Sequence, residues 1–148
     1  MTRTTASRGL AAVAAALACS VLLVGCSGQS EYCATIEKDA DVLNSFGKTR
    51  TDKAYASYES TFRSIAKLSP AGVKDDWMTL ADVTKGVLDA QKQVGLALED
   101  MEDEDKVADL DENQLASLNE AYEAFNGTSS QRDAVVKNAK TECEITLR

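Results

Sequence analysis

The sequence predicts an all-α protein, and specifically an antiparallel four-helix bundle. Apolar residues recur at spacings of three and four along nearly the whole chain, which is the periodicity of helices with one buried face. The 148 residues include a single proline and only 5% aromatic residues. No segment shows the alternating pattern of a half-buried β-strand.

The first two helices are predicted at residues 31–46 and from residue 52 to about Leu68, separated by a loop at residues 47–50. Thr51 can cap the second helix, and Asp52 complements the helix dipole in its first turn. The apolar stripe of the first helix comprises Cys33, Ile36, Ala40 and Leu43. That of the second comprises Tyr55, Tyr58, Phe62 and Ile65.

The third helix is predicted to begin at Ser69-Pro70, with the serine as cap and the proline in the first helical position. Its apolar residues follow the 3.5-residue repeat of helices packed nearly parallel or antiparallel. Thr84 and Gln91 interrupt the repeat. Gly86 and Gly95 are expected to mark a bend or a close helix contact, since glycine is unfavourable inside a helix. The repeat comprises Val73, Trp77, Leu80, Thr84, Val87, Gln91, Val94, Leu98 and Met101.

An acidic segment at residues 99–109 is expected to be a solvated loop. Asp111 can then cap a helix whose buried face is Leu115, Leu118, Tyr122 and Phe125. The sequence Asn126-Gly127-Thr128 breaks this helix. A last helix begins at Ser129 or Ser130, with a face of Val136, Ala139 and Cys143.

The N-terminal residues have the layout of a secretory signal peptide. Arg3 and Arg8 precede an apolar run, Leu10 to Val24, which is followed by Gly25 and Cys26. The run is shorter than the roughly 20 residues of a permanent membrane-spanning helix. Residues 1–25 are therefore predicted to be removed.

The end of this run, Leu23-Val24-Gly25-Cys26, resembles a bacterial lipobox. The resemblance implies a diacylglyceryl lipid on the Cys26 sulfur and an anchor in the cell membrane, on its extracytoplasmic face. It divides the remaining chain into a lipidated tether at residues 26–30 and a helical domain at residues 31–148. The chain as a whole resembles small helical lipoproteins of actinobacteria. The alternatives are a plain signal peptide followed by a chance cysteine, or an uncleaved anchor.

Two cysteines are left for a disulfide, because Cys19 is lost with the signal and Cys26 is acylated. We expect Cys33 and Cys143 to form that bond in an oxidising compartment. The ends of the first and last helices meet only if the number of spans is even. The last two helical segments are therefore predicted to be one span broken at residues 126–129. If they fold back on each other, there are five spans and Cys143 lies at the wrong end.

Charge and composition argue against several functions. The formal net charge is −8, and removal of the two arginines in residues 1–25 leaves −10. Such a charge opposes binding to nucleic acid and to anionic lipid surfaces. The chain has no histidine, no Gly-rich phosphate loop and no remaining thiol nucleophile. The prediction is a non-enzymatic protein without a cofactor.

The pattern closest to a metal site is a partial EF-hand loop. Asp109, Asp111, Asn113 and Glu120 occupy its positions 1, 3, 5 and 12. Gln114 stands where the loop needs glycine. No metal site is therefore predicted, and these four residues remain weak candidates beside the acidic segment.

The function predicted from these features is a membrane-anchored binding or accessory module, with an envelope protein as its partner. Two alternatives stay open. One is a calcium-responsive module in which the acidic segment becomes ordered on binding. The other is a helical bundle with a cavity for an apolar ligand near Tyr58, Phe62 and Trp77.

Overall fold

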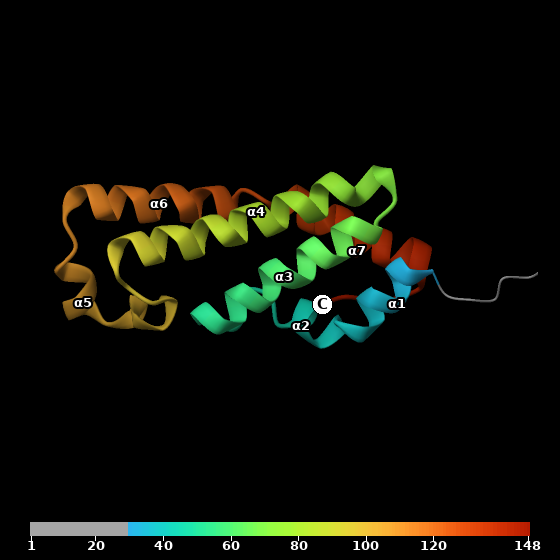
Figure 1. Cartoon of the computed structure of the whole chain (residues 1–148), viewed down its shortest axis with the longest axis horizontal. Helices are drawn as coiled ribbons and strands as arrows, with labels where there is room; N and C mark the ends of the chain where they lie inside the picture. The colour runs from blue at the N-terminus through green and yellow to red at the C-terminus, as the bar shows by residue number, and fades with distance from the viewer. Residues whose placement is uncertain (1–29) are drawn as a thin grey trace, which may run out of the picture.

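A computed structural model describes residues 30–148, and this part of the chain is helical with no strand (Figure 1). The predicted signal peptide and Cys26 lie outside the described residues. None of the helices at residues 30–148 has the length and apolar character needed to cross a membrane. The elements are α1 Glu31–Lys38, α2 Ala40–Asn44, α3 Asp52–Leu68, α4 Ala71–Val94, the 3-10 helix η1 Leu98–Glu102, α5 Glu104–Ala108, α6 Glu112–Asn126 and α7 Ser129–Cys143.

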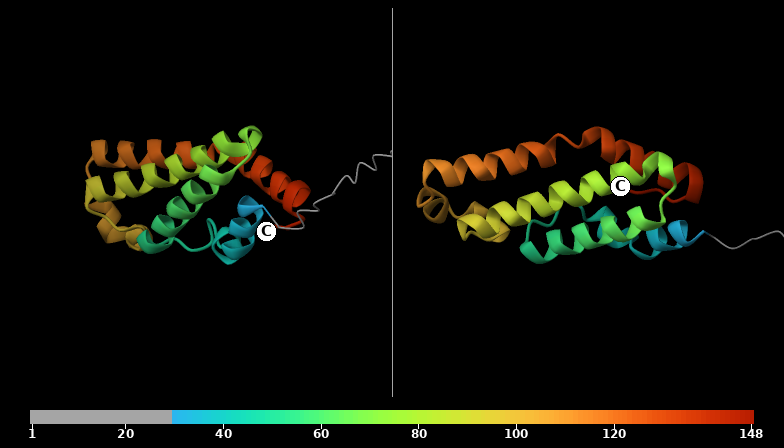
Figure 2. Two further views of the ribbon diagram at one scale, coloured as in Figure 1. Left: turned by 45° about the vertical axis from the view of Figure 1, so that its right-hand side comes forward. Right: turned by 45° about the horizontal axis from the view of Figure 1, so that its top comes forward.

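The long helix α4 is the centre of the fold. It packs against α3, to which it is joined by a short turn, and against both α6 and α7 on another side (Figures 1 and 2). Gln91, near the end of α4, contacts Tyr122 of α6. Gly72 and Val73, at its start, line a shallow surface pocket with α7 residues. The segments α6 and α7 therefore follow α4 one after the other and do not fold back on each other.

The predicted first helix, residues 31–46, is divided into two short helices at Asp39. Asp39 has a φ of −99° and a ψ of 12°, which interrupts the regular helix. Tertiary packing accounts for this difference, since α1 contacts both α3 and α7 whereas α2 packs on α3. The loop begins two residues earlier than predicted, because α2 ends at Asn44. The start of α3 agrees with the prediction, and the Thr51 side chain accepts a hydrogen bond from the N–H of Ala54.

The start of α4 differs by one residue from the prediction. Pro70 is the cap and Ala71 is the first helical residue. Ser69 does not cap α4, because its hydroxyl donates instead to the carbonyl of Ile65 at the end of α3 (2.7 Å). The hydroxyl thus satisfies a terminal carbonyl of the preceding helix.

The 3.5-residue repeat was expected to continue to Met101, but α4 ends at Val94. Gly95 adopts a left-handed conformation with a φ of 72°, and the N–H of Leu96 closes the end on the carbonyl of Gln91. The close helix contact predicted at Gly86 is absent. Gly86 lies inside a continuous helix, and a Cβ there would meet nothing within 4 Å.

The acidic segment is largely exposed to solvent, as expected, but it is not a loop, because it forms η1 and α5. Leu98 of η1 is buried in the core. Asp103 caps α5 through the backbone N–H groups of residues 105 and 106. Asp111 caps α6 as predicted, in a reciprocal capping box with Gln114.

Two residues assigned to buried faces are exposed. Leu115 is 37% exposed in the first turn of α6. In α7, Val136 is 38% exposed and its neighbour Val135 is 4% exposed. The break before α7 sets a new helical phase, which the spacing of apolar residues within α7 alone did not define.

The predicted disulfide between Cys33 and Cys143 is confirmed, with a Cα–Cα distance of 5.2 Å. It joins the start of α1 to the end of α7. Ser30, the first described residue, lies at this same end of the molecule, and α5 lies at the opposite end (Figure 1). The C-terminal residues return along α2, where Leu147 is buried and the N–H of Arg148 donates to the Asn44 side chain.

Candidate functional site

A small cavity opens between the loop that follows α2 and the second half of α6. We name it the cationic pocket, and its volume is about 280 Å³. Its walls contain two arginines and two tyrosines, and no carboxylate is among the described residues that form them. The lining residues are Gly47, Arg50, Tyr55, Tyr122, Phe125, Asn126 and Arg132.

Arg132 reaches this pocket from the first turn of α7, and its guanidinium is fixed by hydrogen bonds and by contacts with two aromatic rings. Its Nε donates to the Thr128 hydroxyl (3.2 Å), and one Nη donates to the carbonyls of Phe125 and Asn126. These carbonyls end α6, so the guanidinium caps that helix. The guanidinium also lies 5.6 Å from the ring centre of Phe125 and 5.9 Å from that of Phe46, which is the geometry of cation–π contacts.

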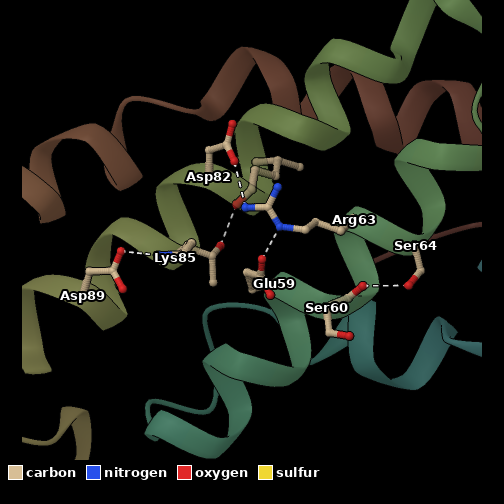
Figure 3. Close-up of polar contacts among 9 residues, drawn as sticks. Glu59, Ser60, Arg63, Ser64, Asp82, Lys85 and Asp89 are labelled. Carbon is tan, nitrogen blue, oxygen red and sulfur yellow. Dashed lines mark hydrogen bonds and ion pairs between the residues drawn. The ribbon is translucent and has the colours of Figure 1, made fainter.

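Arg50 differs from Arg132 because its guanidinium has no hydrogen bond or ion pair within residues 30–148. It is exposed at the end of the loop before α3. Arg63 on α3 illustrates the contrast, since it pairs with Glu59 of the same helix and with Asp82 of α4 (2.9 Å; Figure 3). Lys85 and Asp89 form another pair on α4. Arg50 therefore keeps its charge available to a ligand.

The two tyrosines come from different helices. Tyr55 of α3 stacks on Phe125 with ring centres 5.5 Å apart, and it is 2% exposed. Tyr122 of α6 accepts a hydrogen bond from the Gln91 amide (2.8 Å). Burial is the main cause that raises the pKa of each phenol above its ordinary value. Both phenols are therefore protonated at neutral pH and can act as hydrogen-bond donors.

A larger cavity of about 690 Å³ adjoins the cationic pocket, with which it shares Gly47, Arg50 and Tyr122. We name it the outer cavity. On its other side are η1 residues, including Glu99 and Glu102, so it has both positive and negative walls.

The apolar cavity predicted as an alternative is present in part. Phe62 and Trp77 line a pocket of about 230 Å³ together with Leu43, Leu80 and Leu147. Tyr58 is not part of its wall, because its side chain is buried beside the loop and its hydroxyl donates to the carbonyl of Ser45. The pocket lies beneath the C-terminal residues and not between α3 and α4 alone.

The four weak metal candidates are not brought together. Residues 112–126 are helical, so most of the partial EF-hand loop is part of α6. The Asp111 carboxylate is engaged by the N–H groups of Asn113 and Gln114. Within the described part of the chain, no three acidic or cysteine side chains form a group that could hold a metal ion, Asp109 and Glu120 included.

Sequence reasoning assigned Tyr55, Tyr122 and Phe125 to the core and did not identify the cationic pocket. Arg50 and Arg132 carry no local motif, and they meet only because α6 returns along α4. Because the two arginines are far apart in the sequence, no sequence pattern indicated that they share a site.

No protein-family model matches this chain, and neither a curated protein nor a solved structure shows significant similarity to it.

Proposed function

We propose that this chain is a lipid-anchored, non-enzymatic binding module on the extracytoplasmic face of the cell membrane, and that the cationic pocket with the outer cavity is its binding site. The observation that carries the binding role is the pocket itself. Two guanidinium groups and two phenols converge there in a chain whose formal net charge is −8. Concave sites with a few convergent polar groups are the usual form of ligand sites.

The anchor is proposed from the sequence around Cys26, and the fold suggests how the domain is oriented. A tether of five residues, 26–30, spans at most about 18 Å. The disulfide end, where Ser30 lies, would therefore be close to the membrane. The acidic η1 and α5 are at the opposite end, away from anionic lipid headgroups that would repel them.

We also infer that the helices form the four spans of an antiparallel bundle: α1 with α2, α3, α4, and α6 with α7. The disulfide between the two ends supports an even number of spans, and so does the position of α7 beside the start of α4. Small-angle scattering of the purified protein tests this arrangement, because a five-span chain would be shorter and thicker.

A binding role fits the side chains better than catalysis. The chain has no histidine, and Cys33 and Cys143 are joined in the disulfide. The tyrosines of the pocket have raised pKa values, which disfavours their use as bases at neutral pH.

The anchor is tested by mass spectrometry of the N-terminal peptide from membrane-extracted protein. We expect a diacylglyceryl group on Cys26, and we expect the Cys26→Ala variant to lose it. Cys19→Ala is the matched control and should leave the modification unchanged. A peptide that begins at an unmodified Cys26, or further downstream, would refute the anchor.

The binding role is tested by native mass spectrometry after incubation with a small-molecule extract of the source cells. We expect an adduct that is present with the wild type and with Arg63→Gln but is lost with Arg50→Gln. Arg63 is a suitable control because its charge is already paired on α3 and α4. The absence of any adduct that depends on Arg50 would contradict the proposed site.

A second candidate function is the binding of an apolar ligand, favoured by the pocket beside Phe62 and Trp77. Trp77 is the single tryptophan, so its emission reports on this pocket directly. Titration with decanol should shift the emission in a saturable manner, and the Leu43→Phe variant should weaken that response by filling the space. An unchanged emission would exclude this function.

A further inference from the structure

The polar groups that face the cationic pocket are mainly hydrogen-bond donors without an acceptor. Arg50 has no partner in the described part of the chain. Arg132 uses its Nε and one Nη for the end of α6, which leaves the two N–H bonds of the other Nη. A guanidinium is a donor only, and it matches the two oxygens of a carboxylate or a phosphate group.

The phenols add two further donors. The Tyr122 oxygen accepts from Gln91, so its own hydrogen is free to point elsewhere. The Tyr55 hydroxyl has no hydrogen-bond partner among residues 30–148, although the side chain is 98% removed from solvent and forms part of the pocket wall. The hydroxyl oxygen itself is not fully buried, so it remains accessible from the pocket. A ligand acceptor in the pocket would satisfy it.

The outer cavity limits the charge of the ligand. A group that extends from the cationic pocket past Arg50 would approach Glu99 and Glu102, with Lys48 as the one additional cation on that wall. A second anionic group would be repelled there. Hydroxyl or amino groups of the ligand could donate hydrogen bonds to the two carboxylates.

We infer that the cationic pocket binds an organic monoanion through a carboxylate or phosphodiester group, with the hydroxylated or amino-bearing remainder of the molecule in the outer cavity. This inference rests on the proposed function, because it specifies the ligand of the same site. Arg50 and Arg132 hold the anion, Tyr55 and Tyr122 donate to its oxygens, and the glutamates of η1 select against a second negative charge.

The anionic group that the pocket binds could belong to either of two kinds of molecule, a free solute or the headgroup of an anionic lipid. The η1 wall of the site belongs to the end of the molecule opposite Ser30 and the disulfide (Figure 1). If the chain is anchored through Cys26, this wall of the site faces away from the membrane, and the cationic pocket lies at the junction of α6 and α7. This position favours a free solute.

The test uses membrane-extracted protein in neutral detergent, labelled with ¹⁵N and titrated with four probes. Glycerate supplies a carboxylate, glycerophosphoglycerol supplies a phosphodiester, citrate supplies several charges and glycerol supplies none. We expect saturable shifts of the residue 47–50 amides and of the Arg132 Nε–H with the two monoanions. Citrate should bind more weakly than glycerate, and glycerol should not bind.

Substitutions assign the effect to the pocket. Arg50→Gln should weaken glycerate binding at least about tenfold, as expected for loss of a charge-assisted hydrogen bond. Tyr55→Phe should weaken it by a smaller factor, and Arg63→Gln should not change it. Binding of the monoanions that is unaltered by Arg50→Gln, or equal binding of glycerol, would overturn the inference.

Vesicles of phosphatidylglycerol and of phosphatidylcholine distinguish the source. If glycerate binding is unaffected by either vesicle, the ligand is a free solute. If phosphatidylglycerol vesicles displace glycerate, the lipid headgroup is the source and the anion site still holds. An Arg50-dependent adduct with a neutral or cationic compound would overturn this inference and leave the proposed binding function intact.

Discussion

Asp52 and Glu99 connect two segments that are distant in the chain, the start of α3 and η1. The N–H of Asp52, the first residue of α3, donates to the Glu99 carboxylate (3.0 Å). The Asp52 carboxylate in turn accepts from the N–H of Leu98 (3.0 Å). Glu99 thus places negative charge at the N-terminus of α3, where the helix dipole favours it. The first part of the acidic segment therefore has a structural role, because it holds η1 against the start of α3.

Removing this contact should loosen η1. We expect Glu99→Gln to lower the free energy of unfolding by about 1 kcal/mol, the usual effect of losing a cap interaction. Amide hydrogen exchange at residues 98–102 should become faster. Glu102→Gln is the control, because the Glu102 side chain makes no hydrogen bond or ion pair within residues 30–148, and this substitution should have little effect. Equal exchange rates in both variants would contradict this role of Glu99.

A buried hydrogen-bond chain joins three helices near the disulfide. Trp77 of α4 donates to the Tyr32 oxygen of α1 (3.1 Å), and the Tyr32 hydroxyl donates to Asn138 of α7 (2.7 Å). Tyr32→Phe should lower stability by about 1–3 kcal/mol, because the buried indole N–H loses its acceptor. Urea denaturation measures the loss. Tyr55→Phe is the comparison and should change stability little, since no residue in the described range bonds to its hydroxyl.

Replacing Gly86 and Gly95 by alanine should change the stability of the protein in opposite directions. Gly86 lies inside α4 with open space around it, so Gly86→Ala should stabilise the protein by about 1 kcal/mol. Gly95 has a positive φ of 72° at the end of the same helix, so Gly95→Ala should destabilise it by a similar amount. Thermal melting of both variants is a direct check. Shifts of the same sign would show that the helix does not end at Gly95.

The disulfide closes nearly the whole described chain, with Cys33 and Cys143 separated by 110 residues. Chain-entropy arguments give a contribution of about 4–5 kcal/mol for a loop of this size, and measured losses are about 2–5 kcal/mol. The free energy of unfolding of the Cys33→Ser/Cys143→Ser double variant should therefore be lower by about 2–5 kcal/mol, and its urea midpoint should fall accordingly. Reduction of the wild type should give the same midpoint as the variant. A variant as stable as the oxidised wild type would exclude this contribution.

Stability should fall at alkaline pH because of the tyrosines. The pKa values of Tyr32, Tyr55 and Tyr122 are all raised above 10.0 in the folded protein, with burial the largest cause. The unfolded chain therefore loses these protons at lower pH than the folded chain does. The stabilisation is complete below the unfolded pKa and is lost as the pH rises through the folded values.

Urea midpoints measured from about pH 9 to about pH 11 should show this decrease. Tyr122→Phe should flatten the dependence, since one group with a raised pKa is removed. A Tyr122→Phe curve with the same slope as the wild type would show that this phenol does not contribute.

Local sequence determined most of the helices and several of their ends. Thr51 and Asp111 cap α3 and α6 as predicted, because capping depends on residues within one turn. The pairing of Cys33 with Cys143 followed from the cysteine positions, and the bond is present. The helix caps could be predicted because they depend on neighbouring residues, and the disulfide could be predicted because only two cysteines remained to form it.

Tertiary packing decided the features that involve separate helices. Asp39 breaks the first helix between α1, which contacts both α3 and α7, and α2, which packs on α3. The burial of Val135 in place of Val136 depends on how the chain turns between α6 and α7. The start of the acidic segment is held to α3 by hydrogen bonds with Asp52, which is distant in the sequence. The cationic pocket forms because the return of α6 along α4 brings Arg132 close to the Arg50 loop, and residues so far apart in the chain carry no local pattern that could reveal their contact.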